Sequence, residues 1–219
     1  MAPDPANDAV RRRLRAARAA LSGRERRDAA RSVGRILARL PEVRRARTIA
    51  FYAAIRGELD CGPAIALAWR RGQQVYLPVV RGSRLGFARH APGTRLGSGQ
   101  FGIPVPAAGR ATPWRARDLD VVVAPVVAFD ARGYRLGTGG GWYDRTLAFR
   151  RQRPHVRRPL FIGVAYAFQQ VDTLVVHDHD IALDAIVTPR GARRFGRSAR
   201  GIDGSDRHAM HAANVSQVR

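Results

Sequence analysis

A chain of 219 residues, 45% of them hydrophobic, is long enough to bury the core of one sizeable domain, so we expect a single α/β domain. The single cysteine, Cys61, excludes a disulfide framework and a cysteine-built metal site, and it favours a reducing, cytoplasmic location. No apolar stretch approaches the roughly 20 residues that a membrane span requires, and residues 1–20 hold no uninterrupted apolar core for a secretory signal, so no membrane partner is expected.

The formal net charge of +22 would ordinarily favour a nucleic acid or another polyanion as partner. All 39 basic residues are arginine, however, a pattern more typical of a GC-rich genome than of selection for one partner. The charge is also spread along the chain, with 14 Arg against 5 acidic residues in 1–47, 18 against 10 in 48–189, and 7 against 2 in 190–219. We therefore expect salt-sensitive adsorption to polyanions and no specific nucleic-acid partner.

The chain is predicted to open with an α-hairpin. Residues 1–8 contain two prolines and are expected to form a flexible lead. From Ala9 onward, apolar residues recur at helical spacing on one face: Val10, Leu14, Ala17 and Leu21. Ser22 and Glu25 have the spacing of a capping box, which starts a second helix that ends at Pro41.

Strands and helices alternate over the rest of the chain. Strands are predicted at 48–54, 74–80, 85–89, 119–127, 159–165 and 185–188, and helices at 63–69 and 142–150. This alternation predicts a three-layer α/β fold, with a mostly parallel sheet covered by helices on both faces. Between Gly82 and Pro113 only the strand at 85–89 is expected. Residues 9–189 are predicted to form the domain, and residues 190–219, with few apolar side chains, a disordered basic tail.

A glycine-rich loop lies between the apolar run at 121–129 and the predicted helix at 142–150. Its glycines stand at positions 137, 139, 140 and 141. Such glycines allow positive φ angles and a close approach of the backbone to a ligand, and the next helix begins with unpaired N–H groups that suit phosphate. A tight glycine turn without a ligand is the alternative. The loop is neither a Walker loop, because no Gly-Lys-Ser/Thr follows, nor a dinucleotide fingerprint, because Trp142 stands where glycine is needed.

Read as a whole, the segment Phe129-Asp-Ala-Arg-Gly-Tyr-Arg-Leu-Gly-Thr-Gly-Gly-Gly-Trp-Tyr-Asp-Arg145 resembles the signature of the 5-formyltetrahydrofolate cyclo-ligases, also called 5,10-methenyltetrahydrofolate synthetases. Three further blocks of that family recur in order: Arg11-x-x-Leu-Arg15, Glu58-Leu-Asp60 and His179-Asp180-x-x-Leu-Asp184. The resemblance covers about residues 9–189. It implies conversion of 5-formyltetrahydrofolate and MgATP to 5,10-methenyltetrahydrofolate, ADP and phosphate, by phosphorylation of the formyl oxygen and ring closure by N10.

The resemblance also implies roles for individual residues. The implied ATP-binding residues are Arg11, Arg15, Arg135, Leu136, Gly137, Thr138, Gly139, Gly140, Gly141, Trp142 and Tyr143. Ala53, Glu58 and Trp142 are implied to bind the reduced folate, Asp144 and Asp180 to bind Mg²⁺, and Arg145 and Tyr143 to take part in catalysis. Departures from the family pattern are Arg11 for lysine, Cys61 for threonine, Val175 for proline and Trp142 for tyrosine or phenylalanine. None of them removes a reacting group.

The residues alone leave other interpretations open. Arg11 and Arg15 have the pattern of a solvated helix face, Asp144 that of a first-turn residue favoured by the helix dipole, and Glu58 that of a surface loop residue. Asp180 fits a polar surface turn. His177 and His179 also suggest a transition-metal site, but no third nitrogen or sulfur ligand is evident.

Three functions compete on this basis. The leading hypothesis is a monomeric cyclo-ligase. A second is a relative in the same family that acts on another formylated or pterin-like compound. A third is a basic nucleic-acid-binding protein with an inactive nucleotide pocket, but the sequence has no aromatic RNA-binding signature and no zinc-finger spacing.

Overall fold

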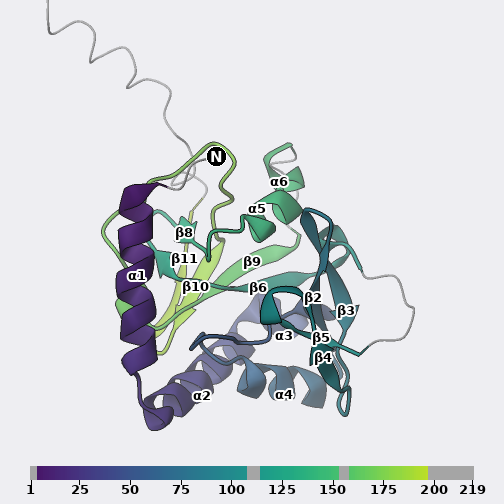
Figure 1. The fold of residues 1–219 in the computed structure, drawn as a ribbon. Helices are drawn as coiled ribbons and strands as arrows, with labels where there is room; N and C mark the ends of the chain where they lie inside the picture. Colours follow the sequence, from purple (N-terminus) through teal and green to yellow (C-terminus); the bar gives the residue numbers. More distant parts are fainter. Residues whose placement is uncertain (1–3, 108–113, 153–157, 197–219) are drawn as a thin grey trace, which may run out of the picture.

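The computed structural model describes residues 4–107, 114–152 and 158–196, which fold around a seven-stranded sheet (Figure 1). The strand order is β11-β10-β9-β6-β1-β2-β3. The strands are β1 Thr48–Ala50, β2 Gln74–Arg81, β3 Arg84–Arg89, β6 Val121–Pro125, β9 Leu160–Val164, β10 Ala185–Thr188 and β11 Gly191–Arg194. Only the two edge strands, β3 and β11, pair antiparallel to their neighbours, which confirms the mostly parallel sheet.

Helices cover both faces of the sheet, as predicted. One face packs against α2 Gly23–Arg39, α3 Pro41–Arg45 and α4 Gly62–Arg70. The other packs against α5 Trp142–Leu147, with α6 Phe149–Gln152 following directly. In β1, Ile49 contributes to the first core and Ala50 to the second, since alternate side chains of a strand point to opposite faces. None of the described helices is long and apolar enough to cross a membrane.

The first helix, α1 Pro5–Ala20, starts four residues earlier than predicted. The side chain of Asp4 accepts hydrogen bonds from the N–H groups of Ala6 and Asn7, and a proline at the first position suits a helix start. Residues 5–8 are therefore helical and do not belong to the expected flexible lead, whose residues 1–3 lie outside the described part. The predicted capping box of Ser22 and Glu25 does start α2.

The region between Gly82 and Pro113 holds more strand than predicted. Beyond β3, a small separate sheet pairs β4 Leu96–Ser98 with β5 Pro104–Pro106. β4 is exposed along its whole length and β5 has two prolines among three residues, so neither shows the apolar alternation that marks a strand. The predicted helix at 142–150 is divided into α5 and α6, and the strand expected at 48–54 ends at Ala50.

The chain beyond Pro189 also departs from the prediction. Residues 191–194 form β11 instead of belonging to a disordered tail, and Phe195 is buried. The N–H group of Phe195 donates to the carbonyl of Asp184. Its ring packs so closely on Gly133 that a Cβ there would lie 2.6 Å from the ring. The ordered domain therefore includes this segment, while the remainder of the predicted tail, residues 197–219, lies outside the described residues.

The sheet topology creates a crevice between β1 and β6. From β1 the chain continues outward to β2 on one side, and from β6 it continues to β9 and β10 on the other. The carboxyl ends of two such neighbouring strands diverge into loops, which is where open α/β sheets bind ligands. The glycine-rich loop follows β6, so the fold carries it to this crevice.

Candidate active site

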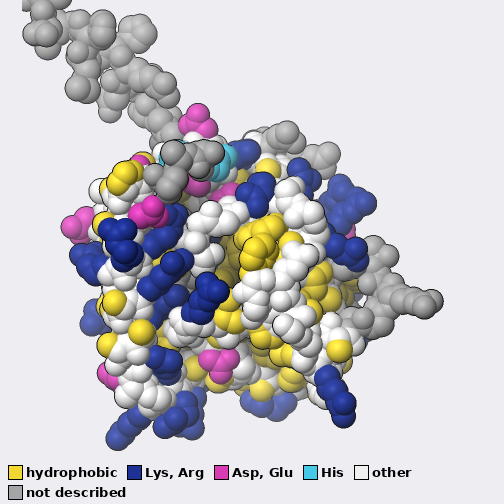
Figure 2. Space-filling model, in the orientation of Figure 1, with side chains coloured by type: hydrophobic (Ala, Val, Ile, Leu, Met, Phe, Trp, Pro, Cys, Tyr) yellow, Lys and Arg dark blue, Asp and Glu magenta, His cyan; other side chains and the backbone are white. Residues whose placement is uncertain are grey.

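A cavity of about 120 Å³ opens at the carboxyl ends of β1 and β6. Ala53 and Glu58 line it after β1, Val127 after β6, and Trp142 and Tyr143 from α5. Its lining is mainly apolar, and Figure 2 shows a hollow with hydrophobic side chains near the centre of this face of the molecule. An apolar cavity with a few polar groups at a topological switch point has the character of a small-molecule site.

The glycine-rich loop forms one wall of the cavity. A hairpin of β7 Ala128–Phe129 and β8 Arg135–Leu136 leads into it, and α5 follows it. Gly139 and Gly141 have φ angles of 108° and 60°, which other residues rarely adopt. At Gly140, a Cβ would collide with the indole of Trp142. These three glycines are therefore required by the backbone conformation or by packing of the loop.

Two arginines of α1 hold the loop from outside. Nε of Arg11 donates to the carbonyl of Gly137 at 3.0 Å, and a guanidinium N–H of Arg15 donates to the carbonyl of Thr138 at 3.2 Å. Arg11 also pairs with Asp8. The structure thus brings the two arginines that were singled out near the start of the chain to the predicted phosphate loop, and neither forms a merely solvated helix face.

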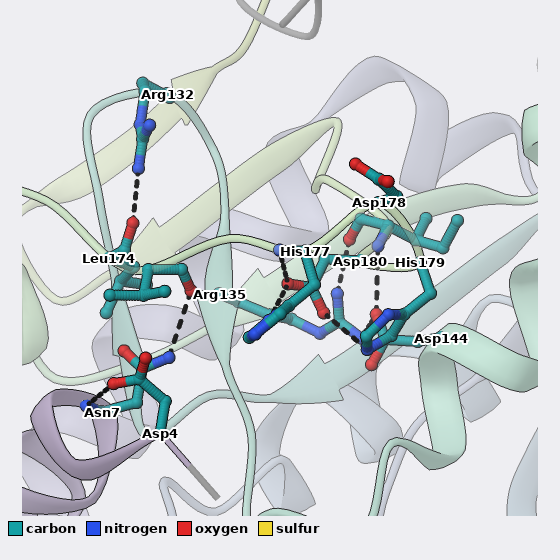
Figure 3. Close-up of polar contacts among 12 residues, drawn as sticks. Asp4, Asn7, Arg132, Arg135, Asp144, Leu174, His177, Asp178, His179 and Asp180 are labelled. Carbon is teal, nitrogen blue, oxygen red and sulfur yellow. Dashed lines mark hydrogen bonds and ion pairs between the residues drawn. The ribbon is translucent and has the colours of Figure 1, made fainter. Parts of the chain in front are cut away.

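Arg135 and Asp144 form an ion pair at the edge of the cavity. Nη2 of Arg135 lies 2.9 Å from Oδ1 of Asp144, and the Arg135 side chain is only 5% exposed. Arg135 also donates to the carbonyl of Ile181 and lies over the ring of Phe161, with 4.6 Å between guanidinium and ring centre. The N–H of Ile181 donates to the same Oδ1 at 3.0 Å. Asp180 precedes Ile181, so this hydrogen bond ties Asp144 to the segment that carries the second carboxylate predicted to bind metal (Figure 3).

Arg145 and Tyr143 have different surroundings. Arg145 donates to the carbonyl of Ser83 at 2.6 Å and to that of Gly140 at 2.7 Å, so it joins the β2–β3 turn to the loop. Its guanidinium lies 5.0 Å from the centre of the Trp142 ring. Tyr143 stacks on Phe161, and burial with the negative charge of Glu58 raises the pKa of its phenol. Its surroundings therefore favour the protonated form of the Tyr143 phenol.

Glu58 is the carboxylate inside the apolar part of the cavity. One of its oxygens accepts the N–H of Ile55 at 3.2 Å. Burial raises the pKa of the Glu58 carboxyl, and the positive charges of Arg18, Arg56 and Arg15 partly oppose that effect. A half-buried carboxylate that lines a mainly apolar cavity can accept hydrogen bonds from a polar edge of a ligand.

Arg18 is a charged neighbour of Glu58 that sequence reasoning missed. It is only 2% exposed, and among the described residues its Nε has no hydrogen-bond partner. Burial lowers the pKa of the Arg18 guanidinium, and the negative charge of Glu58 partly opposes that effect. Arg18 shares one helix face with Arg11 and Arg15, because the three residues stand at positions i, i+4 and i+7. That spacing could have separated Arg18 from the exposed Arg12 and Arg13.

Residues 4–189 match the 5-formyltetrahydrofolate cyclo-ligase family. The chain belongs to that family. Over 177 residues it is 35% identical to the 5-formyltetrahydrofolate cyclo-ligase of Haemophilus influenzae, a match that covers 80% of this chain and 92% of the relative. The corresponding enzyme of Escherichia coli K12 is 39% identical over 152 residues, covering 68% of this chain and 81% of the relative.

Solved structures agree with the assignment to the cyclo-ligase family. The solution structure of the Aquifex aeolicus 5,10-methenyltetrahydrofolate synthetase matches with a TM-score of 0.73 at 35% identity, covering 91% of this chain and 98% of that one. A synthetase from Mycoplasma pneumoniae, 24% identical with a TM-score of 0.65, covers 84% of this chain and 98% of its own and supports the fold alone. The predicted family, the α/β fold and the assignment as an enzyme are thereby confirmed.

Proposed function

We propose that this protein converts 5-formyltetrahydrofolate and ATP to 5,10-methenyltetrahydrofolate, ADP and phosphate, with Mg²⁺ as cofactor. The observation that carries the proposal is the glycine-rich loop, which is tied to α1 by Arg11 and to the β2–β3 turn by Arg145 and forms a wall of the apolar cavity. The names of the relatives support the same reaction.

ATP would bind with its phosphates along the loop from Arg135 to Tyr143. Two arginines, Arg11 and Arg15, lie within hydrogen-bond distance of the loop carbonyls and can turn from these carbonyls to phosphate oxygens. Arg145 stands at the other side of the loop. Because phosphoryl transfer requires mainly positioning and neutralisation of charge, a loop flanked by three arginines suits it.

The carboxylates at the edge of the site fit a magnesium ion. Oδ1 of Asp144 is occupied by Arg135 and Ile181, whereas Oδ2 accepts no hydrogen bond within the described part of the chain. Asp180 accepts the N–H of His177 through Oδ2, which leaves its Oδ1 for a ligand. One oxygen from each residue would complement phosphate oxygens and water around Mg²⁺, which supplies charge neutralisation when bound.

The reduced folate would occupy the apolar cavity. Glu58 would accept hydrogen bonds from the aminopyrimidinone edge, and Ala53 and Trp142 would contact the ring. With the substrate so held, the formyl oxygen takes the terminal phosphoryl group of ATP, N10 attacks the formyl carbon, and phosphate leaves. Arg145 and the neutral phenol of Tyr143 would donate hydrogen bonds to oxygens that gain charge in these steps.

The remaining expectations belong to the same proposal. The protein is proposed to act in the cytoplasm as a monomer, with ATP and a reduced folate as its partners and no specific nucleic acid. Its single cysteine, Cys61, is buried, which is compatible with a reducing compartment.

Release of ADP with different acceptors tests the proposed substrate. Purified protein with ATP and Mg²⁺ is expected to release ADP when 5-formyltetrahydrofolate is present, in a one-to-one ratio with the folate consumed. Release of ADP only with another formylated or pterin-like compound would assign the chain to a relative with a different substrate. No release with any acceptor would contradict an active nucleotide site.

A further inference from the structure

The turn from His177 to Asp180 gathers two imidazoles around one carboxylate (Figure 3). Nδ1 of His177 lies 3.6 Å from Oδ2 of Asp180, and Nε2 of His179 lies 3.8 Å from Oδ1. The two imidazole rings stack, with 5.3 Å between their centres. One ligand atom from each residue lies within 4.8 Å of the other two. The carboxylate therefore offers a third ligand atom beside the two imidazoles, which the spacing of the histidines alone did not reveal.

Asp180 differs from other carboxylates of this arginine-rich chain. Asp120, Asp130, Asp144 and Asp184 each form an ion pair with an arginine. Among the described residues, no arginine is paired with Asp180, and its carboxylate is flanked by imidazoles on both sides. Nearby arginines bind the backbone of the turn instead: Arg151 donates to the carbonyl of Asp178, and Arg135 to that of Ile181. The negative charge of Asp180 is thus available to a cation.

We propose that His177, His179 and Asp180 bind a first-row transition-metal dication, with Zn²⁺ as the best-suited ion. Imidazole nitrogens favour such ions over Mg²⁺, and two histidines with one carboxylate leave further coordination positions for water or a ligand oxygen. Ligand atoms around tetrahedral zinc stand about 3.4 Å apart, as follows from bond lengths of about 2.0–2.1 Å. The imidazole side chains are 37% and 46% exposed, so they are free to rotate by the small amount required.

The proposed ion would share Asp180 with the magnesium site. The proposal rests on the arrangement of the three side chains and not on the catalytic activity, so it is tested without nucleotide or folate. It also has a consequence for the neighbouring site, because Asp180 immediately precedes Ile181, whose N–H and C=O bind Asp144 and Arg135. A transition metal and MgATP are therefore expected to compete for this edge of the active site.

Zinc titration of the metal-free full-length protein by calorimetry tests the proposal. Because His208 and His211 also have metal-binding spacing, all proteins carry His208→Ala and His211→Ala. This background protein is expected to bind one equivalent of Zn²⁺. His177→Ala or His179→Ala should weaken binding at least tenfold, and Asp180→Asn should do the same. Asp178→Asn, which removes a carboxylate from the same turn but not from the cluster, is the matched control and should bind normally.

Melting temperatures without metal show whether each variant is folded, and the Co²⁺ absorption spectrum gives a second readout. Loss of the cobalt bands in His177→Ala and His179→Ala, with normal melting, supports nitrogen ligation by both residues. Zinc affinity that is unchanged in both histidine variants overturns the proposal. So does a background protein that fails to bind zinc below millimolar concentration, or an equal loss of affinity in Asp178→Asn.

Discussion

Oδ1 of Asp144 accepts hydrogen bonds from both the guanidinium of Arg135, at 2.9 Å, and the N–H of Ile181, at 3.0 Å. These bonds connect α5 to β8 and to the segment that follows the His177–Asp180 turn. The carboxylate lies in the first turn of α5, but among the described residues it accepts no hydrogen bond from an N–H group of that helix. Asp144 therefore joins three parts of the active site and keeps one oxygen for a ligand.

Asp144→Asn tests whether that oxygen binds magnesium. Asparagine keeps an acceptor for Ile181 but removes the charge, so the fold should lose only the ion pair with Arg135. Loss of a charged metal ligand should lower kcat at least about a hundredfold, equivalent to about 2.7 kcal/mol. The Mg²⁺ concentration for half-maximal rate should rise. Turnover as a function of Mg²⁺, together with the melting temperature, gives both quantities.

The opposite result would have a clear meaning. An Asp144→Asn protein with a lower melting temperature but the wild-type response to Mg²⁺ would make Asp144 a purely structural partner of Arg135. Magnesium would then be held by Asp180, by water or by the nucleotide alone.

Gly137→Ala tests whether the phosphates of ATP pack against the backbone of the glycine-rich loop. Gly137 does not have a positive φ, and a Cβ at this position would meet no atom within 4 Å. The substitution should therefore leave the melting temperature nearly unchanged. If phosphate packs against this backbone, the added methyl group should raise KM for ATP about tenfold or more, equivalent to about 1.4 kcal/mol. Normal KM for ATP would show that phosphate does not approach Gly137. Gly196→Ala, which also meets open space, is the matched control.

The pH dependence of folate use should report on Glu58. Burial raises the pKa of its carboxyl above the ordinary value of 4.5. Because the ionised form accepts hydrogen bonds at both oxygens, whereas protonation turns one oxygen into a donor, kcat/KM for the folate should fall at acid pH, with a midpoint above 4.5. Arg18→Met removes an opposing positive charge and should move that midpoint to higher pH, whereas Arg18→Lys should restore it in part. Arg13→Met, at an exposed position of α1, is the control. An unmoved midpoint in Arg18→Met would contradict the electrostatic role of Arg18.

The pH dependence of the free energy of unfolding gives an independent check of the raised pKa of Glu58. Between the ordinary and the raised pKa, folded Glu58 keeps a proton that the unfolded chain has released. The contribution of Glu58 to the free energy of unfolding therefore falls as pH rises through this window. Glu58→Gln should abolish that component, which denaturant titrations at a series of pH values would measure. An identical pH dependence in both proteins would show that the pKa is not raised.

Two truncations test where the folded domain ends. A chain that stops at Pro189 loses β11, the buried Phe195 ring on Gly133 and the ion pair of Arg194 with Glu42. Loss of a buried aromatic side chain alone costs about 3–5 kcal/mol, so this protein should melt well below the full-length chain. A chain that stops at Gly196 keeps these contacts and should melt like the full-length protein. Equal melting of the two truncated proteins would contradict a structural role for β11 and Phe195.

Much of the architecture was predictable because its signals are local. The strand and helix alternation and the capping box of Ser22 and Glu25 gave the layers and the second helix. β4 and β5 were missed because three exposed or proline-rich residues carry no periodicity. Phe195 was assigned to a disordered tail because one aromatic residue among arginines has no local pattern. Its burial depends on Gly133, which is distant in sequence.

The site was predictable as a set of residues but not as a set of contacts. The motif blocks named Arg11, Arg15 and the loop, yet their hydrogen bonds join residues from opposite halves of the chain. Arg18 lies outside the four family motifs, so its burial was not predicted. The carboxylate of Asp180 was recognised as a candidate transition-metal ligand only from the turn, which brings its oxygen close to the imidazole nitrogens of His177 and His179.

The near-ultraviolet absorbance of 5,10-methenyltetrahydrofolate tests the central claim most directly, because 5-formyltetrahydrofolate does not absorb there. We predict that purified protein with 5-formyltetrahydrofolate, ATP and Mg²⁺ produces this absorbance. Omission of any one of the three should prevent it. Absence of the band in the complete mixture, from a protein that is folded by its melting curve, would contradict the proposed reaction.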